Sequence, residues 1–162
     1  MARYPLGPLL SVRQYREDAA QNLLRQAERL AREAEAALQE REKELERYRL
    51  WRVEEEDRRY GAIMGQLLSL DDLEEFKAGL GRLRDAELRR EEDVAKADQA
   101  LTKARQAVTD AKSGLSKARR DTARILAHRN IWNEMARLEA ERKEDLESEE
   151  FRPMPIGTGD DA

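Results

Sequence analysis

The sequence predicts an all-α fold, a long antiparallel two-helix coiled-coil hairpin with an overhanging C-terminal helix. Composition is the first reason. Of 162 residues, 41% are charged and 5% aromatic, with eight Gly, four Pro and no Cys, which is typical of long helices and coiled coils. The second reason is that the prolines lie near the two ends, while one glycine-containing segment interrupts the middle. The third is a seven-residue apolar repeat on both sides of that segment.

The helix breakers set the expected elements. We expect one helix over about residues 9–60, a turn over about 61–69 and a second helix over about 70–150. Together they would form a single domain, residues 1–152, followed by a disordered tail at 153–162. At a rise of about 1.5 Å per residue the two helices would be roughly 75 Å and 120 Å long.

Ser69 marks the start of the second helix. Its hydroxyl can accept a hydrogen bond from the unpaired backbone N–H groups of the first turn. Asp72, three residues later, suits the positive end of the helix dipole. We therefore expect a capped helix that begins directly after Ser69.

The second helix carries the clearest seven-residue repeat, in two series offset by three residues. These series are Leu73, Leu80, Glu87, Val94, Leu101, Val108, Leu115 and Thr122, and Phe76, Leu83, Arg90, Ala97, Ala104, Ala111, Ala118, Ile125 and Trp132. The first helix repeats in the same way through Leu24, Ala31, Leu38 and Leu45, and through Ala27, Ala34 and Tyr48. Such a repeat predicts two helices packed along one narrow seam, where alanines allow a close approach.

A short turn makes the two helices antiparallel neighbours. With the turn centred near Gly65, residue i should lie opposite about residue 130 − i, so roughly the last thirty residues of the second helix overhang. The apolar residues expected on this overhang, with nothing in the chain to cover them, are Leu126, Trp132, Met135 and Leu138. Exposed apolar residues indicate a partner surface, although a frayed tail or self-association would expose them too.

Charge is unevenly distributed along the chain, whose net charge is −4. Residues 1–27 carry four arginines against two acidic side chains, and residues 103–129 carry eight basic side chains against two acidic ones. The hairpin would bring these segments together at its open end. A basic end suits an acidic protein or a nucleic acid. Because no aromatic residues are interleaved for base stacking and the whole chain is acidic, a protein partner is favoured over nucleic acid.

No catalytic, cofactor-binding or metal-binding constellation is expected. His128 is the only histidine, so a His-pair metal site or a Ser-His-Asp triad is excluded, and we expect a solvated helical residue there. The acidic run at residues 54–57 is interpreted as a solvated helix face. There is no phosphate-binding glycine loop, no signal-peptide segment at residues 1–12 and no apolar run long enough for direct membrane insertion.

An apolar stripe next to the turn consists of Phe76, Leu80 and Leu83, spaced as neighbours on one helix face. Gly79 and Gly81 lie within it, and each costs a helix interior about 1 kcal/mol relative to Ala. The glycines are either a tolerated weak point or a pliable docking segment. The stripe is either packed inside the hairpin or free to dock, because the first helix offers little apolar cover there.

Three segments resemble the YscO (SctO) family of type III secretion proteins, whose flagellar relative is FliJ. The first runs over residues 4–20 and opens with Tyr-Pro-Leu, the second over 48–60 with Tyr-Arg-Leu-Trp-Arg, and the third over 69–73 with Ser-Leu-Asp-Asp-Leu. The resemblance spans about residues 4–150 and implies a non-enzymatic central stalk. Such stalks sit in the hexameric export ATPase, link it to the cytoplasmic ring of the export gate, and are tied to recycling of secretion chaperones.

The resemblance places Phe76, Leu80 and Leu83 in the region assigned to export-gate contact. Charge and the hairpin geometry, rather than a motif, assign ATPase binding to the open end, and the overhang is the third candidate surface. The residues expected to bind the ATPase are Arg13, Arg16, Arg119, Arg120 and Arg124, and those on the overhang are Leu126, Trp132 and Met135. We expect a cytoplasmic protein peripheral to the inner-membrane secretion apparatus, monomeric when free. The alternatives are a coiled-coil scaffold that dimerises through the overhang, and a helical arm that grips nucleic acid.

Overall fold

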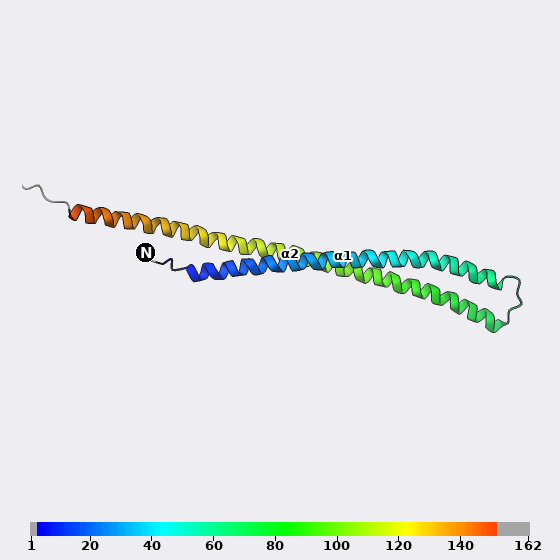
Figure 1. Ribbon diagram of the computed structural model, residues 1–162. Coiled ribbons are helices and arrows are strands. Elements are labelled where there is room, and N and C mark those ends of the chain that lie inside the picture. The colour runs from blue at the N-terminus through cyan, green and yellow to red at the C-terminus, as the bar shows by residue number, and fades with distance from the viewer. Residues whose placement is uncertain (1–2, 152–162) are drawn as a thin grey trace, which may run out of the picture. The chain divides into compact units, whose positions relative to one another are not determined.

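The computed structural model describes residues 3–151. Nearly all of them lie in two helices, α1 (Gly7–Ile63) and α2 (Leu70–Glu150), and no strand occurs within the described range (Figure 1). The predicted all-α two-helix hairpin is therefore confirmed. The tail expected at 153–162 falls outside the described residues.

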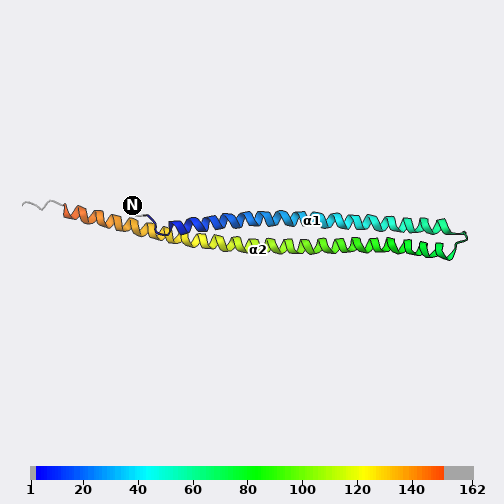
Figure 2. The same ribbon diagram turned by 90° about the horizontal axis from the view of Figure 1, so that it is seen from below.

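Contacts within the chain group it into two compact units. The turn unit is Ala20–Leu115, and the terminal unit joins Met1–Ala19 to Ser116–Ala162. Within the turn unit, α1 and α2 run side by side in opposite directions, as Figures 1 and 2 both show. Each unit thus contains a piece of both helices.

α1 is longer at both ends than the prolines and glycines of the sequence indicated. Its start at Gly7 places Pro8 in the first turn, where a missing N–H costs nothing because that group has no helical partner. At the other end the helix continues through Gly61 to Ile63. A single glycine weakens a helix but does not end it.

The turn reverses the chain over six residues, 64–69. Gly65 has φ +79°, a left-handed conformation that side chains disfavour, and the Gln66 N–H donates to the Ile63 carbonyl at 3.2 Å. At the start of α2, the Asp72 N–H donates to Ser69 Oγ at 3.1 Å. The serine cap expected from the sequence is present.

The seam between the helices follows the predicted repeat. Each of the most buried apolar side chains occupies a repeat position, namely Leu10, Ala27, Leu45, Leu80, Leu83, Leu101, Ala111, Leu115 and Ile125. No large side chain within residues 3–151 is completely buried. The core is therefore one side chain deep. Leu73, in the first turn of α2, departs from the pattern because it is 36% exposed.

The register differs from the expected one by about six residues. Tyr60 was expected opposite residue 70, but its ring packs edge-on against Phe76 with centroids 5.2 Å apart. In the terminal unit, Glu17 was expected opposite residue 113 but pairs with Arg119 at 3.9 Å. One cause is that α1 extends to Ile63, which moves the middle of the turn past Gly65.

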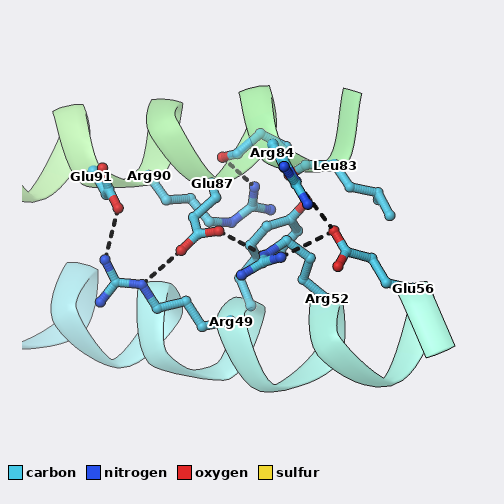
Figure 3. A network of polar contacts seen from close by, with 10 residues as sticks. Arg49, Arg52, Glu56, Leu83, Arg84, Glu87, Arg90 and Glu91 are labelled. Carbon is cyan, nitrogen blue, oxygen red and sulfur yellow. Dashed lines mark hydrogen bonds and ion pairs between the residues drawn. The ribbon is translucent and has the colours of Figure 1, made fainter. Parts of the chain in front are cut away.

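Close to the turn, charged side chains replace apolar ones in the seam (Figure 3). Arg52 occupies a repeat position of α1 and its Nε lies 2.7 Å from Oε2 of Glu87, a repeat position of α2. Arg49 reaches Glu87 at 2.9 Å and Glu91 at 2.7 Å. Hydrogen bonds to Glu91 and Glu87 raise the pKa of Arg49 above its ordinary value. We call these four residues the ionic layer.

Tyr48, next to Arg49 in α1, also reaches α2 at the ionic layer. Its hydroxyl donates to the Leu83 carbonyl at 2.6 Å, and the Arg90 guanidinium lies 4.0 Å from the centre of its ring. The acceptor of the hydrogen bond is a backbone carbonyl, whose position is fixed by α2 itself. The contact with Arg90 is a cation–π interaction. Because paired charges inside a seam tolerate only one alignment, we interpret the ionic layer as the feature that fixes the register of the helices.

Glu55 is a second charged residue of the seam and is only 8% exposed. It accepts hydrogen bonds from Arg58 and Arg59, the latter at 3.0 Å. The hydrogen bond from Arg59, followed by the charge of Arg58, lowers the pKa of the Glu55 carboxyl. The guanidinium of Arg59 in turn lies against α2, where a Cβ on Gly79 would meet it at 3.1 Å. Gly79 therefore makes room for a seam arginine.

The first prediction compares the stability effects of truncating a buried leucine and an exposed leucine of α2. Leu83 is 8% exposed, whereas Leu88, five residues later, is 55% exposed. Leu83→Ala should lower the free energy of unfolding by about 2–5 kcal/mol because it leaves a cavity in a buried layer. Leu88→Ala, the matched control, should change it by about 0.5 kcal/mol or less. Urea denaturation followed by circular dichroism measures both, and equal small effects would contradict the burial of Leu83.

The second prediction concerns the loss of thermal stability at low pH. Because the pKa of Glu55 is lower in the folded state than the unfolded value of about 4.3, its stabilisation is full above that value and is lost as pH falls through the folded-state pKa. The drop in Tm between about pH 7 and about pH 3 should be smaller in Glu55→Gln than in the unmodified chain. Glu54→Gln, which alters an exposed neighbour, should keep the full drop. An unchanged drop in Glu55→Gln would refute this role.

Candidate interaction surfaces

The described residues offer surfaces rather than a chemical centre. Within residues 3–151, no three His, Cys, Asp or Glu side chains gather as they would around a metal ion. In the same range neither helix has an apolar stretch long enough to cross a membrane. We therefore examined the charged and apolar surfaces that each unit presents.

The terminal unit presents a basic surface formed by both helices. Arg16, Arg120 and Arg124 are exposed. Arg119 is also exposed, with its Nε 3.9 Å from Glu17. The fifth expected residue, Arg13, has a different position: it is half-buried and donates to the Asp121 carbonyl at 2.9 Å. Four of the five arginines can thus meet a partner directly, while Arg13 holds α1 against α2.

The N-terminal segment covers part of the expected overhang. The Tyr4 hydroxyl lies 2.6 Å from His128 Nδ1, and the Tyr4 ring packs edge-on against Trp132 with centroids 5.6 Å apart. Leu126 and Trp132 are both half-buried. The expectation that these two residues have no cover was therefore wrong, whereas His128 is exposed as expected. Tyr4 precedes the helix expected from about residue 9 and belongs to no repeat, so the sequence did not indicate its contact with α2.

The exposed part of α2 lies beyond Trp132. Met135 and Leu138 are 65% and 51% exposed, as expected, and Ile131 at 61% extends the same helix face. Ile131 was not predicted, although it precedes Met135 by four residues and Leu138 by seven, the spacing of neighbours on one helix face. Arg137 pairs with Glu134 and Glu141 of its own helix, and the first of these hydrogen bonds lowers the pKa of Glu134. An apolar stripe on an otherwise charged helix is thus available for a partner.

The stripe next to the turn is part of the seam. Leu80 and Leu83 are 9% and 8% exposed, and Phe76 is half-buried beside Tyr60. The expectation that α1 covers this stripe poorly was wrong, because Tyr60 packs on Phe76 and Arg59 lies beside Gly79. The free apolar side chains at this end are those of the turn itself. They are Met64 at 79%, Leu67 at 105%, Leu68 at 38%, Leu70 at 72% and Leu73 at 36% exposed, and we call them the turn patch.

The chain is similar to proteins of a known family. The family described as Type III secretion protein YscO matches residues 6–153. The crystal structure of type III secretion protein YscO from Vibrio parahaemolyticus is similar at a TM-score of 0.87 and 25% identity, covering 91% of this chain and 92% of that one. A YscO homolog from Chlamydia trachomatis, CT670, is similar at a TM-score of 0.74 and 26% identity, covering 93% and 92%. No curated protein sequence matches.

The family match covers almost the whole described chain, and both solved relatives carry the same family name over more than nine-tenths of their length. Apart from Tyr4 and Pro5, the segments that carry the sequence resemblance lie inside the matched range. The Tyr-Pro-Leu start contributes Tyr4 to the contact with α2, and the segment around Trp51 contributes Arg49 and Arg52 to the ionic layer. The chain belongs to the YscO family of type III secretion proteins.

Proposed function

We propose that the chain is the non-enzymatic central stalk of a type III secretion apparatus. In this proposal it links the hexameric export ATPase to the export-gate ring on the cytoplasmic side of the inner membrane, and it also meets secretion chaperones. The observation that carries the proposal is the pairing of two chemically distinct surfaces, one in each unit. The terminal unit has exposed arginines, whereas the turn unit ends in exposed apolar side chains.

The arginine surface suits the ATPase. Arg16 comes from α1, and Arg119, Arg120 and Arg124 come from two turns of α2, so the charges belong to one rigid pair of helices. Exposed arginines attract an acidic surface over distances of about 8 Å at physiological ionic strength and can bind carboxylates with two hydrogen bonds. Their partner in this proposal is an acidic inner surface of the hexamer.

The turn patch suits the export gate better than the stripe that the resemblance assigned. Leu80 and Leu83 would have to leave the seam to reach a partner, whereas Leu67 and Leu70 are already exposed to solvent. Phe76 is half-buried and can border the contact. Exposed apolar side chains gathered on six residues of turn and the first turn of α2 are typical of an interaction site.

A scaffold that dimerises through the overhang is the second candidate. The exposed face of Ile131, Met135 and Leu138 favours it, because a partner helix could cover all three at once. Loss of self-association on changing these residues, with ATPase and gate binding absent from the unmodified chain, would favour the scaffold. Nucleic-acid binding would appear as salt-sensitive association with DNA or RNA.

The third prediction tests the arginine surface. The triple variant Arg119→Glu, Arg120→Glu, Arg124→Glu should bind the cognate export ATPase about 10-fold or more weakly at low salt, with a smaller difference at high salt. Its helicity should be almost unchanged because the side chains are exposed. A matched control makes the same change of charge on the outward face of α1, in Arg29→Glu, Arg32→Glu and Lys43→Glu. ATPase affinity measured by interferometry that is equal in the two triple variants would refute the assignment.

The fourth prediction tests the turn patch. Replacing Met64 and Leu67 by Gln should abolish binding to the export-gate ring and stop secretion, while the melting temperature and ATPase binding stay unchanged. Leu50→Gln with Leu88→Gln removes the same number of exposed apolar side chains elsewhere and should leave gate binding intact. Normal gate binding by the turn variant would show that the contact lies elsewhere.

A further inference from the structure

The two flanks of the turn unit have opposite character. On one flank, oppositely charged side chains join α1 to α2: Arg49 with Glu91 at 2.7 Å, Glu56 with Arg84 at 3.7 Å and Glu35 with Arg105 at 4.0 Å. On the other flank lies an apolar groove of about 650 Å³. Small side chains form its floor, namely Ala20, Ala27, Ala104, Ala107, Ala111 and Gly114. One flank is thus closed by ion pairs, and the other is open.

Two leucines border the groove on the α1 side. Leu23 is 58% exposed and Leu30 is 47% exposed, one seven-residue repeat apart. Across the groove the corresponding positions of α2 are Ala107 and Gly114. The flank therefore consists of large side chains on one helix beside a hollow on the other. A flank of this shape complements a copy of itself, because the leucines of each copy can enter the hollow of the other.

The outer edges of this flank carry opposite charges. On α2 the exposed edge residues are Arg82, Arg89, Lys96, Lys103 and Asp110, and on α1 they are Gln26, Glu33, Glu40, Arg47 and Glu54. Four of five are basic on α2, and three of five are acidic on α1. The edge positions of the two helices therefore attract one another when α1 of one copy lies over α2 of another.

We propose that two copies of this chain pair through this flank as a parallel two-fold dimer. A two-fold axis along the hairpin places α1 of each copy over α2 of its partner, so Leu23 and Leu30 enter the hollow at Ala107 and Gly114. Glu33 then faces Lys103, Glu40 faces Lys96 and Glu54 faces Arg82. Arg47 beside Arg89 is the one like-charged pair, and Arg47 is already 3.8 Å from Glu40 of its own helix.

The charges also select the direction of the pairing. An antiparallel two-fold dimer would set α2 against α2 and α1 against α1, so that basic edges meet basic edges and acidic edges meet acidic edges. Like charges placed opposite one another disfavour that arrangement. In this proposal the free chain is a dimer, whereas the sequence led us to expect a monomer. It uses neither the exposed arginines of the terminal unit nor the turn patch, so it stands or falls independently of the stalk function.

The fifth prediction is self-association of the full-length chain. Sedimentation equilibrium should show a monomer–dimer equilibrium with a dissociation constant on the order of 10 µM, weakening as salt is added. Leu23→Gln with Leu30→Gln removes four buried leucines per dimer and should weaken the dimer roughly 100-fold with an unchanged melting temperature. Leu50→Gln with Leu88→Gln, equally exposed residues off this flank, should leave it unchanged. A monomer at all concentrations would overturn the proposal.

Disulfide crosslinking tests the direction, since the chain has no Cys of its own. A mixture of Glu33→Cys and Lys103→Cys chains should crosslink into a heterodimer, because these positions face one another in the parallel dimer. Glu33→Cys alone should not, because the two copies of that position lie diagonally. A dimer that crosslinks only in the single variant would refute the parallel arrangement. A dimer that survives Leu23→Gln with Leu30→Gln but dissociates with Met135→Gln would show that the overhang is the interface.

Discussion

Close approach of two helices over small side chains is the constraint on which the rest of this structure depends. Alanines such as Ala27 and Ala111 fill the seam in the middle of the chain, so the backbones come near one another with little apolar volume between them. A core one side chain deep leaves long arginines and glutamates within reach of the opposite helix. The cross-helix ion pairs are a consequence of that narrow core.

Different parts of the structure were predictable to different degrees. The seam, the Ser69 cap and the fold class follow from residue type and spacing, because a seven-residue repeat and a side-chain cap are local features. The register depended on where α1 ends, and a lone Gly61 was too weak a signal to place that end. Glu87 belongs to the predicted repeat, but its spacing does not indicate that it pairs with Arg52 across the seam.

The candidate surfaces likewise include features that follow from local sequence and features that depend on distant residues. Exposure of the arginines followed from the heptad pattern, since residues outside the seam face solvent. The cover of Trp132 did not, because it depends on Tyr4, a residue of the N-terminal segment that is distant in sequence. Tyr4 reaches His128 across more than a hundred residues of chain. No repeat pattern contains that information.

The ionic layer also bears on how the turn unit responds to a lengthwise force. Alanine layers have no protruding side chains to interlock, so they resist sliding of α1 past α2 only weakly. Arg49 and Arg52 pair with Glu87 and Glu91 across the seam, and sliding of one helix past the other would stretch all of these pairs together. Resistance to shear is therefore concentrated in one short layer beside the turn, and a displacement imposed on one helix is passed to the other at that layer.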